Sequence, residues 1–248
     1  MRECKYFLPG ILLVVWATPG LAQQDSDGWT VRFAPYLWGL ALEGTSAIGP
    51  LPPSEIDASF SDILDNANYA LSIHTEFEKG PWTFVIDPTV MSLSMDVTQN
   101  MPPVTGTMDI DMWFVEAWAA YEIAPKWELL GGVRWQSQEI AAAIMLGPDP
   151  LPFPDIDVDW TDVFVGARFS SDLGSRWFLT ARVDAVAAGD SDSSLNASAF
   201  FNRRIGQSMT LNLGYRYYTD EYQEGSGTSL YDWDMDMSGP VIGYTWEF

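Results

Sequence analysis

Short segments in which apolar and polar residues alternate recur along most of this chain, and they constrain its fold more than any other feature. Residues 242–248 place Ile, Tyr, Trp and Phe at every second position, with Gly, Thr and Glu between them. The same alternation recurs near 69–77, 127–136, 163–169, 177–185 and 209–217. A period of two residues is typical of a β-strand whose two faces meet different surroundings. The sequence therefore predicts an all-β chain.

The apolar face of nearly every segment carries aromatic residues, and aromatic residues make up 14% of the chain. A soluble β-sandwich does not normally place aromatic side chains on the outward face of most strands. Residues 23–248 contain no apolar run long enough for a membrane-spanning helix. We therefore expect a transmembrane antiparallel up-and-down β-barrel of ten strands, with eight or twelve as alternatives. The expected strands are 29–42, 69–78, 81–97, 106–122, 126–144, 158–170, 176–188, 193–204, 208–220 and 230–248.

The connections between these segments alternate between short and long. Short periplasmic turns and longer outer loops are typical of outer-membrane barrels, and an even strand count places both termini in the periplasm. Four tryptophans open strands just after the N-terminus or a short turn, which indicates an aromatic girdle at the periplasmic interface. These are Trp29, Trp82, Trp127 and Trp177.

The N-terminus has the features of a secretory signal. Arg2 and Lys5 precede a short apolar stretch, and Gly20, Leu21 and Ala22 provide small residues for cleavage. We expect residues 1–22 to be removed, leaving residues 23–248 as a single barrel domain in the outer membrane of a Gram-negative bacterium.

Two local features add expectations about the wall. The alternation changes phase at residues 238–240, which predicts a β-bulge there. The long connection at 43–68 contains Phe60, Ile63 and Leu64 at helical spacing, with Ser61 as a candidate cap. This segment is an ordinary surface loop or one that folds over or into the mouth of the barrel.

Charged residues fall on the lumen face of several expected strands. A ten-stranded barrel is narrow, so these side chains must pack against one another, and an unpaired charge there is costly. The pattern is compatible with an internal salt-bridge network that fills the barrel, or with a constriction that passes small solutes or ions. The residues are Arg134, Arg168, Arg182, Arg216, Glu76, Asp87, Glu116, Glu128, Asp162 and Asp184, with Arg32 as a further candidate.

Acidic residues gather early in the strands that would run downward from the outer mouth. They are Asp109, Asp111, Asp155, Asp157, Asp159, Asp232, Asp234 and Asp236. Alternate spacing places each set on one side of its strand, where carboxylates can recruit cations. A solvated acidic rim is the simpler interpretation, and a defined metal site is the alternative. We expect no cofactor beyond loosely bound divalent cations, which could bridge the rim to lipopolysaccharide phosphates.

The chain carries 12 Lys and Arg against 34 Asp and Glu, a formal net charge of -22. Such a surface repels nucleic acid, so no nucleic-acid partner is expected. Acidic adaptation to a salty habitat explains this balance as well as a function does. His74 is the only histidine, and Ser72 and Glu76 lie on its face of the strand. We interpret His74 as a structural hydrogen-bonding residue, so the chain is not expected to be an enzyme.

Several short motifs, spread over almost all of residues 23–248, resemble a widespread proteobacterial family of OmpA-like outer-membrane β-barrel proteins. The motifs are Pro35–Gly39, Phe60–Leu64, Gly131–Arg134, Phe164–Arg168, Leu213–Tyr217 and Gly239–Phe248. The resemblance implies assembly by the outer-membrane insertion machinery, which recognises a terminal strand with a final aromatic residue. Tyr244, Trp246 and Phe248 would form that assembly signal. The members mostly have no assigned activity, and the acidity of this chain argues against an anion-binding lumen.

Three functions remain open. The first is a structural or porin-like barrel for small solutes, with any conductance preferring cations. The second is a surface protein whose acidic outer loops bind cations, envelope polymers or a host partner. The third, less favoured, is a barrel hydrolase that uses His74.

Overall fold

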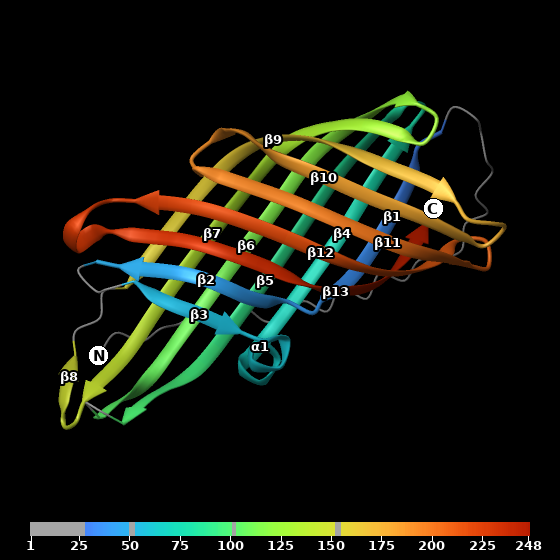
Figure 1. Ribbon diagram of the computed structural model, residues 1–248. Helices are drawn as coiled ribbons and strands as arrows, with labels where there is room; N and C mark the ends of the chain where they lie inside the picture. Colours follow the sequence, from blue (N-terminus) through green and yellow to red (C-terminus); the bar gives the residue numbers. More distant parts are fainter. Residues whose placement is uncertain (1–27, 50–52, 101–102, 152–154) are drawn as a thin grey trace.

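The computed structural model describes residues 28–49, 53–100, 103–151 and 155–248. In this part of the chain the strands form one antiparallel sheet that closes where β1 pairs with β13 (Figure 1). The wall has ten strand positions, so the expected fold class and strand number are confirmed. The expected signal peptide at 1–22 lies outside the described residues. No helix among the described residues is long and apolar enough to cross a membrane.

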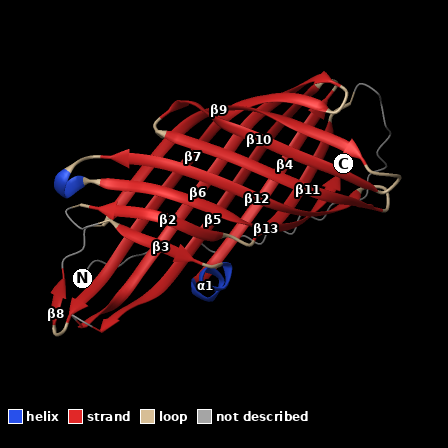
Figure 2. Cartoon of the chain, viewed as in Figure 1, coloured by secondary structure: helices blue, strands red, loops and turns tan. Residues whose placement is uncertain are grey.

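The strands of the wall differ widely in length. They are β1 (Thr30–Trp38), β2 (Ala41–Ile48), β3 (Ser54–Ala58), β4 (Ala67–Lys79), β5 (Trp82–Asn100), β6 (Pro103–Ala124), β7 (Trp127–Leu146), β8 (Asp149–Leu151), β9 (Ile156–Asp172), β10 (Trp177–Gly189), β11 (Ser193–Ile205), β12 (Met209–Glu224) and β13 (Tyr231–Glu247). One short α-helix, α1 (Phe60–Asn66), and one 3-10 turn, η1 (Gly227–Ser229), complete the described structure (Figure 2). β8 is a short return strand that pairs only with β7.

Two of the ten wall positions are built from two strands each. β1 and β2 follow the same edge of β13 in one register, because Trp38 pairs with Val241 and Ala41 pairs with Ser238. β3 pairs with β2, β4 pairs with β1, and α1 interrupts this second position. The expectation of a connection throughout 43–68 was therefore wrong. Gly44 lies within β2, where a Cβ would overlap the Asp234 carbonyl oxygen. This glycine therefore permits close packing of β2 on β13.

Helix α1 forms at the predicted apolar spacing, but its cap differs from the expected one. Ser59, and not Ser61, caps the helix: the Asp62 N–H donates to Ser59 Oγ, and the Ser59 N–H donates to the Asp62 carboxylate. Ile63 is buried against the barrel, whereas Phe60 and Leu64 are exposed.

β13 crosses a boundary at which the two faces of the wall exchange their polarity. Toward the C-terminus its outward residues are apolar, and Ile242 is 47% exposed. Toward its start the outward residues are Asp232, Asp234 and Asp236, while Trp233, Met235 and their odd-numbered neighbours are buried. β12 pairs with β13 without a register shift throughout, so the predicted bulge at 238–240 is wrong. The backbone keeps its phase; only the polarity of its surroundings changes.

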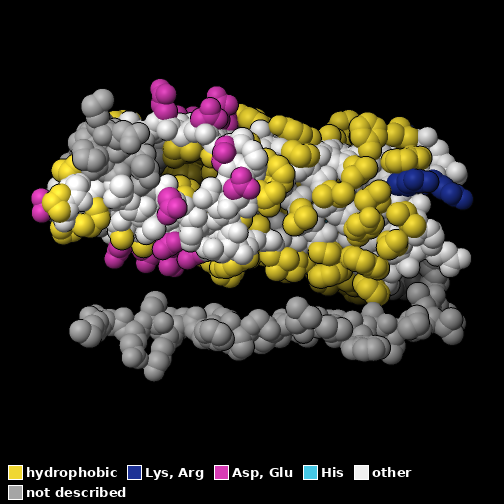
Figure 3. All heavy atoms as spheres, turned by 90° about the horizontal axis from the view of Figure 1, so that it is seen from below, with side chains coloured by type: hydrophobic (Ala, Val, Ile, Leu, Met, Phe, Trp, Pro, Cys, Tyr) yellow, Lys and Arg dark blue, Asp and Glu magenta, His cyan; other side chains and the backbone are white. Residues whose placement is uncertain are grey.

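The barrel therefore has two halves of opposite character. In the turn half, which contains the four short turns and Phe248, apolar residues face outward and charged residues face inward. In the acidic half, carboxylates face outward and an apolar core fills the interior (Figure 3). That core contains Leu40, Leu42, Ile63, Met91, Leu93, Ile140, Trp160, Tyr218, Tyr222, Tyr231, Trp233, Met235 and Met237. The turn half has the polarity of a lipid-embedded barrel, and the acidic half has that of a water-soluble one.

Candidate functional site: the ionic interior

A layer of ion pairs crosses the barrel between its two halves, and we call it the waist. Arg134 on β7 is 0% exposed, and its guanidinium contacts Glu116 Oε1 at 2.6 Å and Asp184 Oδ1 at 2.8 Å. Its Nη1 donates to Ser194 Oγ at 3.0 Å. The partners come from β6, β10 and β11, so the waist ties together strands from around the barrel. A buried charge needs this degree of pairing to be tolerated.

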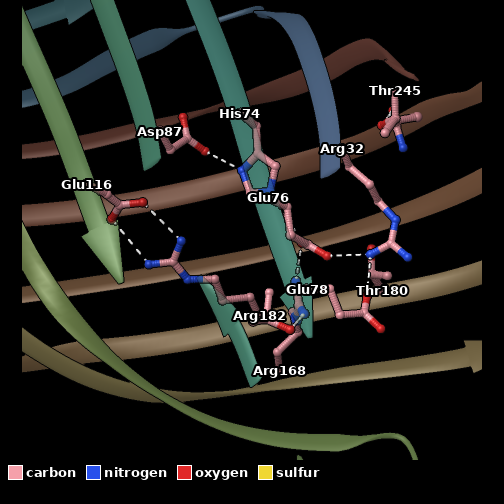
Figure 4. A network of polar contacts seen from close by, with 12 residues as sticks. Arg32, His74, Glu76, Glu78, Asp87, Glu116, Arg168, Thr180, Arg182 and Thr245 are labelled. Atoms are coloured by element: carbon pink, nitrogen blue, oxygen red, sulfur yellow. Dashed lines mark hydrogen bonds and ion pairs between the residues drawn. The ribbon is translucent and has the colours of Figure 1, made fainter. Parts of the chain in front are cut away.

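Two further arginines converge on the same carboxylate. Arg182 donates to Glu116 Oε2 at 2.9 Å, and Arg216 lies 3.5 Å from that oxygen (Figure 4 shows Arg182 and Glu116). Arg182 also lies 2.6 Å from Asp184. Three guanidinium groups and two carboxylates therefore share one buried cluster.

Two aromatic rings lie close to the Arg134 guanidinium. The rings of Phe164 and Tyr218 have their centroids 4.7 Å from its central carbon. Such contacts gain strength when water is excluded. The Arg134 side chain is therefore fully enclosed by protein groups.

A second set of ion pairs lies nearer the turns. Arg32 contacts Glu76 at 2.6 Å, Glu78 at 2.6 Å and Glu247 at 2.8 Å, which links β1, β4 and β13 (Figure 4). Arg168 contacts the other oxygen of Glu76 at 2.7 Å and Glu128 at 2.5 Å. Glu76 thus joins the two arginines into one network.

His74 lies between carboxylates in this network. Its Nδ1 is 2.8 Å from Asp87 and its Nε2 is 3.6 Å from Glu76. Tyr36 donates to the second Asp87 oxygen at 2.7 Å, and Ser72 accepts a hydrogen bond from Thr89. A histidine acting as a general base needs one free ring nitrogen within reach of a nucleophile. Here both nitrogens face carboxylates, Nδ1 within hydrogen-bond distance and Nε2 farther away, and the structural role of His74 stays a prediction.

A cavity of about 620 Å³ occupies the turn half below the waist, and we call it the vestibule. Its wall includes Arg32, Glu76, Arg168 and Arg182, and it extends to the short turns through Gly80, Pro81, Lys126 and Gln207. The vestibule is therefore a chamber with several charged side chains in its wall that reaches the turn end. At its inner end lie the waist and then the apolar core of the acidic half.

Among the described residues, Asp162, like Asp87, makes no ion pair with an arginine. Its carboxylate accepts hydrogen bonds from the Asp190 and Ser191 N–H groups and from Ser191 Oγ. Ser191 Oγ also lies 3.0 Å from Asp220, whose carboxylate accepts from Gln136 and Trp160. Around Asp162 and Asp220, neutral hydrogen-bond donors take the place that arginines have around Glu116.

The predicted acidic rim lies on the outer surface of the acidic half, and the register adds carboxylates to it. Strand pairing sets Asp111 beside Glu139 and Glu139 beside Asp157. A second row joins Asp57, Glu43 and Asp236 across β3, β2 and β13. We call these two rows the carboxylate rungs. Among the described residues, no group of three or more His, Cys, Asp or Glu side chains is arranged to hold a metal ion.

The four predicted girdle tryptophans all lie at the turn end and face outward, each at least 40% exposed. Trp82 packs on Tyr121 at 4.8 Å and Trp127 on Phe169 at 4.9 Å, between ring centroids. The three outward residues at the end of β13, Tyr244, Trp246 and Phe248, reach the same end. The Phe248 N–H donates to the Val31 carbonyl, which closes the β1–β13 seam there.

Sequence reasoning missed the neutral partners of the network. Ser194, Asn196 and Tyr36 each bind an arginine or a carboxylate of the interior. The alternation could have placed Asn196 on the lumen face, since Leu195 and Ala197 beside it face outward. The carboxylate rungs could not be found this way, because they depend on which strands are neighbours and in which register.

No protein-family model and no curated protein matches this sequence. Among solved structures, the outer-membrane protease OmpT from Escherichia coli matches with a TM-score of 0.51 at 7% identity, over 90% of this chain and 98% of that chain. The translocator domain of the autotransporter NalP from Neisseria meningitidis gives 0.49 at 13% identity, over 91% and 90% of the two chains. Ail, the attachment invasion locus protein of Yersinia pestis, gives 0.37 at 9%, over 90% and 99%. The likeness to OmpT shows the fold alone, that of a bacterial outer-membrane β-barrel. The resemblance to the OmpA-like family stays a prediction.

Proposed function

We propose that this chain is a closed outer-membrane β-barrel of a Gram-negative bacterium that anchors an acidic surface outside the cell. The waist carries the proposal: Arg134, Glu116 and Asp162 are 0% exposed, and Trp160, Tyr218 and Met235 fill the interior beyond them. A pore that prefers cations would need a continuous water path through this layer. We therefore favour a structural barrel over a pore that conducts cations.

The orientation follows from the polarity of the two halves. The apolar outer face and the tryptophan girdle of the turn half suit a bilayer and its interface. The acidic half then projects into water on the side opposite the short turns. With both termini in the periplasm, the carboxylate rungs face the outside of the cell.

Conductance of the purified protein in a planar bilayer tests the closed state. We expect no stable single-channel current in potassium chloride at any concentration, because the waist leaves no water path. Protection of the turn half from protease in the same membranes would verify insertion. A steady, cation-selective current from inserted protein would contradict the proposal.

The carboxylate rungs favour a second role, as a surface that binds cations and, through divalent ions, the phosphates of lipopolysaccharide. Each rung sets like charges directly opposite one another, which destabilises a sheet unless ions screen them. Oxygen ligands of this kind suit calcium and magnesium. The repulsion within each rung thus favours the binding of cations along the outer wall of the acidic half.

Neutralising the centre of one rung tests this role. Glu139→Gln is expected to stabilise the barrel by about 0.5 kcal/mol in low salt, since it removes two repulsions. The gain should vanish in about 1 M salt, where the screening length falls to roughly 3 Å. Urea unfolding with and without magnesium measures both effects. Glu55→Gln is the control, because Glu55 faces Thr45. Equal behaviour of the two variants would count against the rung.

A further inference from the structure

A second, smaller cavity of about 70 Å³ lies inside the barrel, where the ionic network gives way to the apolar core. Its walls are almost entirely apolar and include Trp38, Met91, Met112, Phe114 and Met237. Methionine side chains adapt easily to the shape of a guest. A single water needs only about 10–15 Å³ of such space, so the cavity has room for a small organic molecule.

The cavity reaches the wall at a place where the wall is open. Pairing between β1 and β4 ends at Tyr36 and Ser72. Beyond that point Leu37 is paired only on the β13 side and Ala70 only on the β5 side, and both residues line the cavity. The outer surface at this seam is apolar: Leu37 is 62% exposed and Leu71 is 51% exposed. The seam therefore faces the lipid that surrounds the turn half.

Two residues of the cavity wall carry buried donors without an acceptor. Among the described residues, Trp38 Nε1 and Gln138 Nε2 have no hydrogen-bond partner, and Gln138 is 2% exposed. Gln138 Oε1 accepts from the Tyr231 hydroxyl at 2.6 Å, which fixes which end of the amide remains unpaired. Buried donors normally have partners. An otherwise apolar cavity with two unused donors is matched by a guest that brings an acceptor.

We propose that this cavity binds a small lipophilic molecule bearing one acceptor oxygen, such as an ether or ketone, which enters from the lipid through the seam between β1 and β4. The apolar wall disfavours a charged guest, since a buried ion without a partner is costly. The two donors distinguish an oxygen-bearing guest from a hydrocarbon of the same shape. The proposal goes beyond the anchoring role and needs only that the turn half lie in a bilayer.

Titration of ¹⁵N-labelled full chain in lipid nanodiscs with tetrahydrofuran tests this site, with cyclopentane as a control of matched shape that lacks the oxygen. We expect saturable shifts of the Trp38 indole and Gln138 amide signals with tetrahydrofuran only. The indole groups of Trp118 and Trp233 are internal controls, because they are also buried without partners but do not line this cavity. Their signals should stay in place.

Substitution supplies a second measurement. Gln138→Met keeps the side-chain length and removes the donor, so the affinity for tetrahydrofuran should fall roughly tenfold, the effect of one hydrogen bond. Gln207→Met, at an exposed turn, should leave the affinity unchanged. Heat-modifiable migration on gels verifies that each variant folds.

Three outcomes would overturn the site: no saturable shift in the unmodified chain, an equal response to cyclopentane, or equal shifts at Trp118 and Trp233. A water molecule that merely satisfies the two donors would produce the first of these. Failure of the chain to fold into nanodiscs would instead contradict the membrane-anchoring proposal. Folded chain without shifts would contradict this site alone.

Discussion

Replacing Arg134 with methionine is expected to cost the barrel about 3 kcal/mol of unfolding free energy. Methionine is unbranched and apolar, but it ends at about the position of the arginine Nε and so also loses the contacts of the guanidinium with the Phe164 and Tyr218 rings. It removes the charge that pairs with Glu116 and Asp184, and breaking a buried pair from one side costs roughly 3–5 kcal/mol. Arg182 still contacts both carboxylates, so the expected loss of unfolding free energy lies at the lower end of this range. Equilibrium urea unfolding in detergent micelles, followed by tryptophan fluorescence, measures it.

Arg204→Met is the matched control for this substitution. Arg204 pairs with Asp172 at 2.8 Å near a short turn, but its side chain is 45% exposed and that of Asp172 is 68% exposed. Exposed pairs contribute about 0–1 kcal/mol, so this variant should unfold close to the unmodified chain. A loss at Arg134 no greater than the loss at Arg204 would show that the waist does not hold the strands together.

The exchange of polarity along β13 predicts an equally large contrast between neighbouring positions. Met235 is 0% exposed in the apolar core, so Met235→Asp buries a carboxylate among apolar side chains. The expected loss is about 4 kcal/mol or more, because a buried charge without a partner is among the most costly substitutions. Asp234→Met, one residue away on the exposed face, should change stability by less than about 1 kcal/mol.

The turn half should respond in the opposite sense. There Ile242 faces outward, and Ile242→Lys should cost up to about 4 kcal/mol, the upper value for a cation at the bilayer midplane. Unfolding of the three variants from the same lipid vesicles compares them directly. A tolerated Met235→Asp would contradict the apolar core of the acidic half. A loss at Asp234→Met as large as the one expected at Met235 would contradict the water-exposed position of Asp234.

Much of the wall was predictable because period-two alternation depends only on the backbone. It located the ten strand positions and put Arg134, Arg168 and Glu116 on the inner face, where the structure has them. It failed where the surroundings change along a strand. At Ser238–Pro240 the apolar residues move from the inner to the outer face of β13, while its pairing with β12 continues without a shift. The alternation alone therefore predicts a bulge where only the surroundings of the strand change.

The arrangement of the site depended on information that alternation lacks. The inner face of each strand was predictable, but not which charges share a level of the barrel. Asp162 and Arg134 are cross-strand neighbours, yet Asp162 bonds to the Asp190–Ser191 backbone and not to the guanidinium. The meeting of three arginines at Glu116 likewise depends on the registers of β6, β7, β10 and β12 together.

The closed waist that we propose would give the molecule an electrical and chemical sidedness. Protons, salts and small reagents would then enter the vestibule from the solution at the turn end, because Arg134 and Glu116 beyond it are 0% exposed. The carboxylate rungs sample the solution at the opposite end. One chain thus carries two sets of ionisable groups that sample separate aqueous compartments, and a membrane-impermeant reagent added to one side should reach only one set.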